Sequence, residues 1–253
     1  MLFRSTNYNY DSDRLTLYYD SMTTPIQSLD ISMKEPNNAE VRRTLKKKNV
    51  PGYIKGDYDC QRVHVTARDG KTQIPVSFVY RRDVKEKWES GETVPVHMIG
   101  YGSYGACSEA DFSATRLTLL NRGIVCAVAH IRGGGEMGRQ WYEEPNGAKY
   151  LCKENTFNDF VDVAKWFIEV SDVTRGMFRG GNQTSHSSCF LQGKKMTTSE
   201  QLSIEGRSAG GLLIGATINQ APEIFKCAIL GVPFVDVAAT MCDSSIPLTT
   251  NEW

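Results

Sequence analysis

One short stretch, SIEGRSAGGLLIG at residues 203–215, constrains the fold of this chain more than any other. An apolar run typical of a β-strand leads to a serine between glycines, and a second apolar run typical of a helix follows. Residues 206–210 match the pattern GxSxG in the strand, turn and helix context that this motif requires. Bulky neighbours would clash in so tight a turn, and glycine removes the clash. The stretch therefore predicts a sheet covered by helices, with the hydroxyl of Ser208 raised above it as a nucleophile.

The helix that begins near Gly210 would direct its N-terminal amides at the same point. The backbone N–H of Ala209 could then hold the negative charge that develops on a substrate oxygen during acyl transfer. A glycine-rich turn with an incidental serine is the structural alternative. The motif alone does not choose between a lipase, an esterase and a peptidase.

The chain changes character near residue 52. Residues 1–52 contain short strands and polar turns, which predict one small antiparallel sheet that would be marginal by itself. Residues 53–253 contain a hairpin, continuous apolar strands and helices, which predict an α/β domain with a mostly parallel sheet covered on both faces. Residues 171–196 show no periodicity and exceed a normal helix-to-strand connection, so we expect an irregular insertion, a disordered loop or an error in the deduced sequence there. The predicted strands cover 14–19, 26–31, 40–45, 62–67, 74–80, 94–99, 124–131 and 227–232.

The clearest helix in the sequence precedes this insertion. Thr156 and Asp159 occupy positions like those of a capping box, and the apolar residues recur at helical spacing. We expect that apolar face to be part of the core. Its members are Phe157, Phe160, Val161, Ala164, Phe167 and Ile168.

Charge and composition exclude several classes of partner. The chain has 29 Lys and Arg against 29 Asp and Glu, so no net charge attracts nucleic acid or an anionic membrane surface. No apolar stretch reaches the roughly 20 residues that cross a bilayer, and residues 1–13 lack the apolar middle of a secretion signal. The 7 cysteines form no CxxC pair, so we expect reduced thiols, no metal and no other cofactor. These features predict a cytoplasmic protein whose partner is a small molecule or a peptide.

Four blocks of the sequence carry a family resemblance. They are VHMIGYGSYGACSEADFSATRL at 96–117, AHIRGGGEMGRQWYEE at 129–144, NTFNDFVDVAKWFIE at 155–169, and EGRSAGG with the residues that follow it, 205–253. Together they resemble the prolyl oligopeptidase family, and within it the oligopeptidase B group. The resemblance implies a truncated α/β-hydrolase fold at 53–253, preceded at 1–52 by the last blade of a β-propeller. It also implies a serine peptidase that cleaves short peptides after Arg or Lys through an acyl-enzyme at Ser208.

The resemblance adds a second donor to the oxyanion hole. Tyr101 in IGYGSYG matches the family's tyrosine, whose hydroxyl acts beside the amide of Ala209. A phenol is a suitable donor to an oxyanion, and the flanking Gly100 and Gly102 would let the backbone approach closely.

The resemblance also implies how a basic substrate is bound. Glu252 matches the primary specificity acid and Phe234 the aromatic residue beside it, a pair that suits arginine better than lysine. Glu109 and Asp111 match acidic positions that favour a second basic residue in the peptide. Without the resemblance, each of these acids would be read as a solvated surface residue.

Two other functions compete with this interpretation. Residues 133–138 satisfy GxGxxG after a strand and could cradle a dinucleotide, although MGRQWYEE is a poor helix to pack on a sheet, and the family's RGGGE loop explains the same glycines. An esterase or lipase commonly carries an HGGG-type loop, where this chain has GYGSYG.

A serine nucleophile needs a base, and α/β-hydrolases supply the acid and then the histidine after the serine in the chain. No histidine follows Ser208, and the 4 histidines of the chain all precede it. We therefore expect the triad acid and base to lie outside this chain, which would be inactive by itself. The alternative from another functional class is a non-catalytic protein that uses the retained specificity acids to bind basic peptides or a partner subunit. The histidines are His64 and His97 in predicted strands, His130, and His186 in the insertion.

Overall fold

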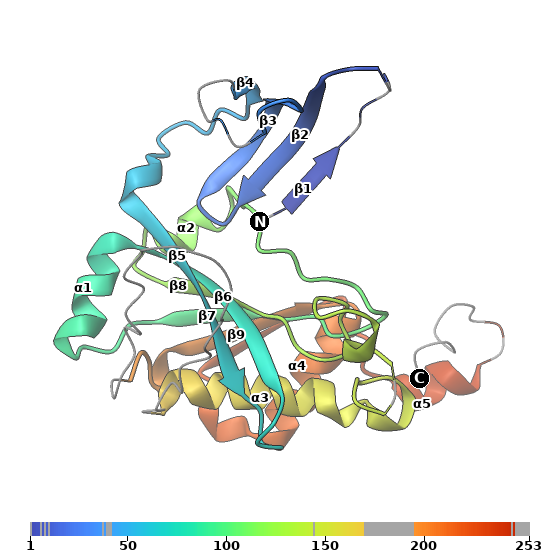
Figure 1. The fold of residues 1–253 in the computed structure, drawn as a ribbon. Coiled ribbons are helices and arrows are strands. Elements are labelled where there is room, and N and C mark those ends of the chain that lie inside the picture. The colour runs from blue at the N-terminus through green and yellow to red at the C-terminus, as the bar shows by residue number, and fades with distance from the viewer. Residues whose placement is uncertain are drawn as a thin grey trace.

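The computed structural model describes residues 2–5, 7, 9, 11–36, 38, 42–143, 145–169, 195–243 and 245 (Figure 1). The first part of the chain forms a four-stranded antiparallel sheet in the order β1-β2-β3-β4. Its strands are β1 (Leu2–Ser5), β2 (Arg14–Ser21), β3 (Thr24–Ser32) and β4 (Arg43–Lys47). The small sheet that the sequence predicts is therefore present, with one strand more than expected. Its assignment to a propeller blade stays a prediction.

The second sheet has six strands in the order β10-β9-β7-β8-β6-β5. Strands β10, β9, β7 and β8 run parallel to one another, and the hairpin β5–β6 joins them antiparallel through β6. Every residue of β8 is buried, as expected for a parallel strand with both faces covered. The α/β architecture with a mostly parallel sheet is thus confirmed. Its strands are β5 (Tyr58–Thr66), β6 (Gln73–Arg81), β7 (Val96–Ile99), β8 (Val125–Ala129), β9 (Leu202–Arg207) and β10 (Cys227–Gly231).

Helices α3 and α4 lie side by side under one face of this sheet (Figure 1). The main core lies between them and the strands, and its largest fully buried members include Phe78, Phe160 and Phe167. A smaller cluster on the opposite face joins Leu120, Cys126 and other side chains. The helices are α1 (Arg82–Ser90), α2 (Leu117–Leu120), α3 (Glu154–Ile168), α4 (Ala209–Gln220) and α5 (Val237–Cys242), with single turns η2 (Lys55–Asp57), η3 (Arg139–Trp141), η4 (Tyr150–Cys152), η5 (Ser199–Gln201) and η6 (Pro222–Ile224).

The predicted insertion falls almost wholly outside the described residues. The exception is its last part, where Met196 is buried and its amide donates to Phe167 O at 3.2 Å. Its carbonyl in turn accepts from Val94 N at 2.8 Å. The chain has therefore rejoined the core by residue 196, slightly earlier than the sequence pattern suggests.

The capping role expected for Thr156 and Asp159 is wrong. Helix α3 has no side-chain cap, and both residues are fully buried within it. The Asp159 carboxylate accepts the backbone N–H of Arg132 at 3.0 Å and the guanidinium of Arg132 at 2.9 and 2.6 Å. Burial raises the pKa of Asp159, and the hydrogen bonds and charge of Arg132 oppose that shift. This buried ion pair fastens the loop after β8 to helix α3.

Glycines bring the loops after β7 and β8 into backbone contact. Gly105 N donates to Gly133 O at 3.0 Å, and a Cβ added to Gly133, whose φ is +96°, would overlap the carbonyl oxygen of Gly102. A Cβ on Gly135 would likewise overlap Gly105 O. The space in which a pyrophosphate would have to lie is thus filled by protein backbone. Only the single turn η3 follows the loop, so the structure disfavours a dinucleotide site at residues 133–138.

Strand β9 passes into helix α4 through the turn that contains Ser208. The φ of +57° and ψ of −120° at Ser208 lie in a backbone region that residues other than glycine rarely adopt. A Cβ on Gly206 would overlap the carbonyl oxygen of Gly210, and one on Gly211 would lie 2.5 Å from Pro233 Cα. Gly206 of the motif and Gly211 just after it are thus required by the closeness of strand, helix and following loop.

The buried ion pair can be tested by removing one partner. Arg132→Met leaves the Asp159 carboxylate buried without its cation, so we expect a loss of about 3–5 kcal/mol in the free energy of unfolding. Denaturant titration measures this change. Arg139→Met, which breaks an exposed ion pair with Glu143 on the same loop, should leave the stability nearly unchanged. Equal losses in the two variants would contradict the structural role given to Arg132.

The close packing at the serine turn allows a second prediction about stability. Gly206→Ala should destabilise the protein by about 1–3 kcal/mol, because the new methyl group forces strand and helix apart. Gly215→Ala in helix α4 meets only ordinary contacts, with Val235 Cγ1 at 3.5 Å and Leu230 Cδ2 at 3.9 Å, and should raise the stability by about 0.5–1 kcal/mol through lower chain entropy. Denaturant titration of both variants distinguishes the cases. A neutral Gly206→Ala would show that the turn is not crowded.

Candidate active site

Ser208 lies at the carboxyl end of β9, immediately before helix α4, and is exposed. Four backbone hydrogen bonds hold its strained conformation, and one of them runs from Leu212 N to Ser208 O at 3.3 Å. Ser208 N donates to Gly231 O at 2.9 Å, and Ser208 O accepts from Gly211 N at 2.8 Å and Phe234 N at 3.1 Å. The hydroxyl is thus presented to solvent from a rigid turn, at the helix end where the dipole favours negative charge.

Ala209 is the first residue of α4 and is buried. Its backbone amide is one of the first four of the helix, which have no acceptor within the helix itself. An amide without a partner in the helix thus adjoins Ser208, and its role in an oxyanion hole stays a prediction.

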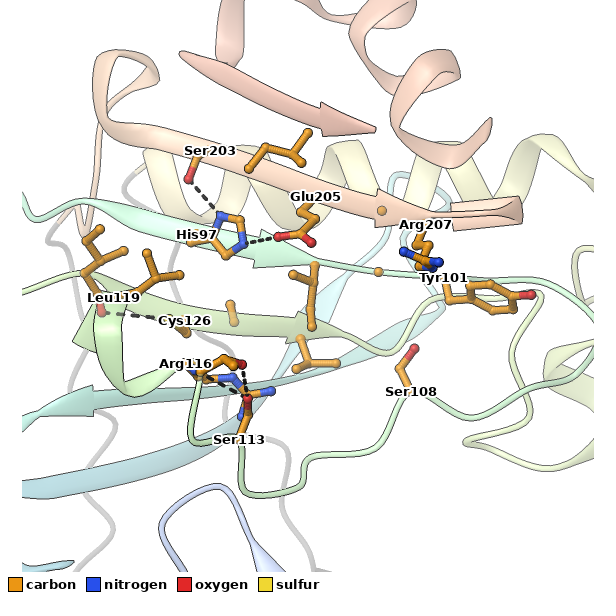
Figure 2. Close-up of a pocket in the computed structure, with 18 of the residues that line it drawn as sticks. His97, Tyr101, Ser108, Ser113, Arg116, Leu119, Cys126, Ser203, Glu205 and Arg207 are labelled. Carbon is orange, nitrogen blue, oxygen red and sulfur yellow. Dashed lines mark hydrogen bonds and ion pairs between the residues drawn. The ribbon is translucent and has the colours of Figure 1, made fainter. Parts of the chain in front are cut away.

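Tyr101 follows β7, the strand next to β9, and lines the same cavity as Ser208. A Cβ added to Gly210 would lie 3.4 Å from Tyr101 Cδ2, so the tyrosine ring packs against the first turn of α4. Figure 2 shows Tyr101 beside Arg207, at the ends of these two strands. Tyr101, Ser208 and Ala209, which the sequence analysis selected separately, are therefore brought together at one edge of the sheet.

The cavity has a volume of about 910 Å³. It runs from Tyr101 and Ser208 along the sheet face opposite α3 and α4, under the segment that joins β7 to α2 (Figure 2). Glu109 and Asp111 lie in that segment and line the cavity. Asp111 Oδ1 is 3.8 Å from the Arg116 guanidinium, which also donates to Asp111 O at 2.9 Å. Glu109 is exposed and is therefore the more available of the two acids for a basic ligand.

Only one member of the expected specificity pair, Phe234, lies within the described residues. Phe234 lies in the loop after β10, and its amide donates to Ser208 O, but its side chain is not part of the cavity wall. Glu252 lies outside the described residues. The pairing of Phe234 with Glu252 stays a prediction.

Arg207 is a cavity residue that the sequence analysis missed. It is the variable residue before the serine, is exposed and lines the cavity (Figure 2). The signal was the alternation along β9, where Leu202, Ile204 and Gly206 are buried while Glu205 and Arg207 are exposed. A strand with one apolar side presents its other residues to the opposite face of the sheet.

His97 takes part in a Ser–His–Glu hydrogen-bonded set on the cavity wall (Figure 2). Its Nδ1 lies 3.0 Å from Ser203 Oγ and its Nε2 3.1 Å from Glu205 Oε2. Burial lowers the pKa of His97, and the charge of Glu205 opposes this shift. Ser203 lies within β9, whose backbone pairs with β7 on one side and β10 on the other, so its neighbours offer no free amides for an oxyanion. The set stabilises the contact between strands and is not a catalytic centre.

His130 and His64, the other histidines of the described residues, also lie apart from Ser208. His130 is 2% exposed, and its Nε2 lies 2.8 Å from Ser77 Oγ while its Nδ1 is 3.7 Å from Glu136 Oε1. His64 is on the edge strand β5, and His186 is outside the described residues. Within the described part of the chain, no histidine contacts the Ser208 hydroxyl.

The described residues contain neither a metal-binding cluster nor a membrane-spanning helix. No cluster of three or more His, Cys, Asp or Glu side chains there is arranged to hold a metal ion. None of the helices in this part of the chain is both long and apolar enough to span a membrane.

Curated proteins with similar sequences are peptidases. The chain is 42% identical to dipeptidyl aminopeptidase BI of Pseudoxanthomonas mexicana over 98% of its length, and 35% identical to protease 2 of Moraxella lacunata over 97%. It spans 30% of the length of each of these relatives.

Solved structures agree with the sequence comparison. Oligopeptidase B from Leishmania major is 40% identical with a TM-score of 0.77, over 97% of this chain and 30% of that one. Oligopeptidase B from Trypanosoma brucei, with covalently bound antipain, gives the same identity and TM-score over 100% of this chain and 32% of that one. A profile of the prolyl oligopeptidase family matches residues 110–181 and 185–253, more than half of the sequence. The chain belongs to the prolyl oligopeptidase family.

Proposed function

We propose that the protein of which this chain is part is a serine peptidase that cleaves short peptides after arginine or lysine. The observation that carries this proposal is the exposed Ser208 in a strained turn, at the N-terminus of α4 and beside Tyr101. Family membership supports peptide hydrolysis rather than ester hydrolysis.

In the proposed reaction Ser208 Oγ forms a bond to the carbonyl carbon of the scissile peptide. The carbonyl oxygen takes up the displaced electron pair, and the N–H of Ala209 and the hydroxyl of Tyr101 donate hydrogen bonds to it. Collapse of this intermediate breaks the carbon–nitrogen bond and leaves the acyl group on Ser208, from which water later releases it. The proton moves from the serine to the leaving amine through a base.

That base is expected outside the described residues. His97 and His130 are both buried and hydrogen-bonded elsewhere, and neither can reach Ser208 without loss of those contacts. We infer that the 253 residues alone do not turn over substrate. They would retain the acids that recognise a basic peptide, so binding without hydrolysis is the second candidate function for the isolated chain.

Charge supports the preference for basic peptides. We expect Glu252 and Phe234 to supply the carboxylate and the ring with which an arginine guanidinium pairs best, and Glu109 in the cavity wall to receive a second basic residue. Arg116 and Arg207 also line the cavity, and the contacts of Asp111 with Arg116 and of Glu205 with His97 leave Glu109, among the described acids of the cavity wall, without a recorded ion pair.

The catalytic assignments can be tested in the full-length protein with an arginine-containing fluorogenic peptide. Ser208→Ala should lower kcat by about 10⁶-fold and abolish labelling by a fluorophosphonate. Tyr101→Phe should lower kcat by roughly 10²–10³-fold, the usual cost of one oxyanion-hole donor. Tyr104→Phe is the matched control, because Tyr104 is a neighbouring exposed tyrosine whose ring lies 6.5 Å from that of Tyr101. Undiminished hydrolysis by Ser208→Ala would refute the proposal.

The specificity assignments are tested by comparing substrates. Glu252→Gln should lower kcat/KM for peptides cleaved after arginine by about 30-fold or more, the cost of unpairing a buried charge, and should affect short acyl esters far less. Glu109→Gln should matter only for peptides with two basic residues. Glu223→Gln, an exposed acid away from the cavity, is the control. Faster hydrolysis of acyl esters than of arginine peptides by the unmodified protein would favour an esterase instead.

A further inference from the structure

Lys153 connects helix α3 to the loop that carries Tyr101. It is the residue immediately before α3, and its ammonium donates to Gly102 O at 2.8 Å and to Ser103 Oγ at 2.7 Å. Ser103 is 1% exposed, so the lysine side chain reaches inward. The contact with Ser103 joins residues 50 positions apart in the chain. Both acceptors lie in the two residues that follow Tyr101, the proposed oxyanion donor.

The dipole of helix α3 disfavours a cation at the position of Lys153. The N-terminus of a helix carries partial positive charge, which disfavours a cation there by typically about 0.3–1 kcal/mol. A lysine would be more stable near the C-terminus of the helix, where the dipole favours a positive charge. Charge-assisted hydrogen bonds to the loop can offset the unfavourable dipole.

The loop has little freedom apart from this contact. A Cβ on Gly100 would lie 2.7 Å from Phe160 Cε2, and one on Gly102, whose φ is +68°, would lie 2.5 Å from Thr156 Cγ2. The hydroxyl of Thr156 is 3.2 Å from Gly102 O. The glycines on both sides of Tyr101 therefore pack against α3, and Lys153 supplies the only cation in the described residues with a recorded hydrogen bond to Gly102 O.

We propose that Lys153 is a positioning residue that acts through Tyr101. By holding Gly102 O and Ser103 Oγ it sets the direction of the backbone that carries the phenol, and hence the place of the hydroxyl relative to the oxygen of the substrate. This inference rests on the proposed function. Its physical basis is preorganisation, since a misplacement of about 1 Å at a catalytic group can cost on the order of 10²-fold in rate.

The experiment is a double-mutant cycle on the full-length protein with the arginine-containing peptide. Lys153→Met keeps the length of the side chain and removes the donor, and should lower kcat by roughly 10–100-fold while KM changes little. Lys153→Arg keeps the charge and should recover part of kcat. Lys149→Met is the matched control, because Lys149 lies over the rings of Tyr142 and Tyr150 at 5.1 and 4.5 Å rather than on the Tyr101 loop. We expect the control to keep the unmodified kcat.

The second arm of the cycle separates positioning from general stability. In a Tyr101→Phe background, Lys153→Met should cost less than about three-fold in kcat, because the hydroxyl that it positions is already absent. The same loss in both backgrounds, or no loss in either, would overturn the proposal. If Lys153→Met does not fold, Ser103→Ala removes one acceptor of the lysine on the Tyr101 loop and should show a smaller loss of kcat with the same coupling to Tyr101.

The outcomes also distinguish this proposal from the proposed function. If Ser208→Ala and Tyr101→Phe leave hydrolysis unchanged, the proposed function fails whatever Lys153 does. If those two variants behave as expected and Lys153→Met is additive with Tyr101→Phe, only the positioning role fails.

Discussion

The backbone contact between the loops after β7 and β8 is the constraint on which the arrangement of the site depends. The two strands are parallel neighbours, so both loops begin at the carboxyl ends of the strands and lie against each other. Glycine at positions 102, 105 and 133 lets the two backbones approach to hydrogen-bonding distance. Tyr101 is consequently attached to a packed double layer of backbone and not to a free surface loop.

Helix α3 supports this double layer through its polar residues while its apolar face forms the core. Phe160 and Phe167 are fully buried against the sheet, and Asp159, next to Phe160 in sequence, binds Arg132 of the loop after β8. Any change in the register of α3 would therefore disturb the core and the site together. A buried ion pair is weak support for stability because its desolvation is costly, but it ties the loop to one position of the helix.

Sequence patterns were sufficient where a requirement is local. The turn at Ser208 needs glycine because strand, helix and loop converge within a few residues, and the motif with its two apolar runs expresses that need. They were insufficient where partners are distant in the chain. Thr156 and Asp159 have the spacing of a capping box, but their partners are Gly102 and Arg132 on other elements. The link of His97 to Ser203 and Glu205 joins strands over 100 residues apart, so no local pattern could reveal it.

What the sequence determined by itself is the order of most strands, the long helix before the insertion, and the strained turn with its serine, because hydrophobic periodicity and backbone sterics act between near neighbours. Only the tertiary structure decided which glycines face one another, that Arg132 and Asp159 form a buried pair, and that Lys153 reaches the Tyr101 loop. Such contacts depend on how the strands are ordered in the sheet, where β7 lies between β8 and β9. The physical reason is that burial and close packing are properties of the assembled core, to which residues far apart in the chain contribute equally.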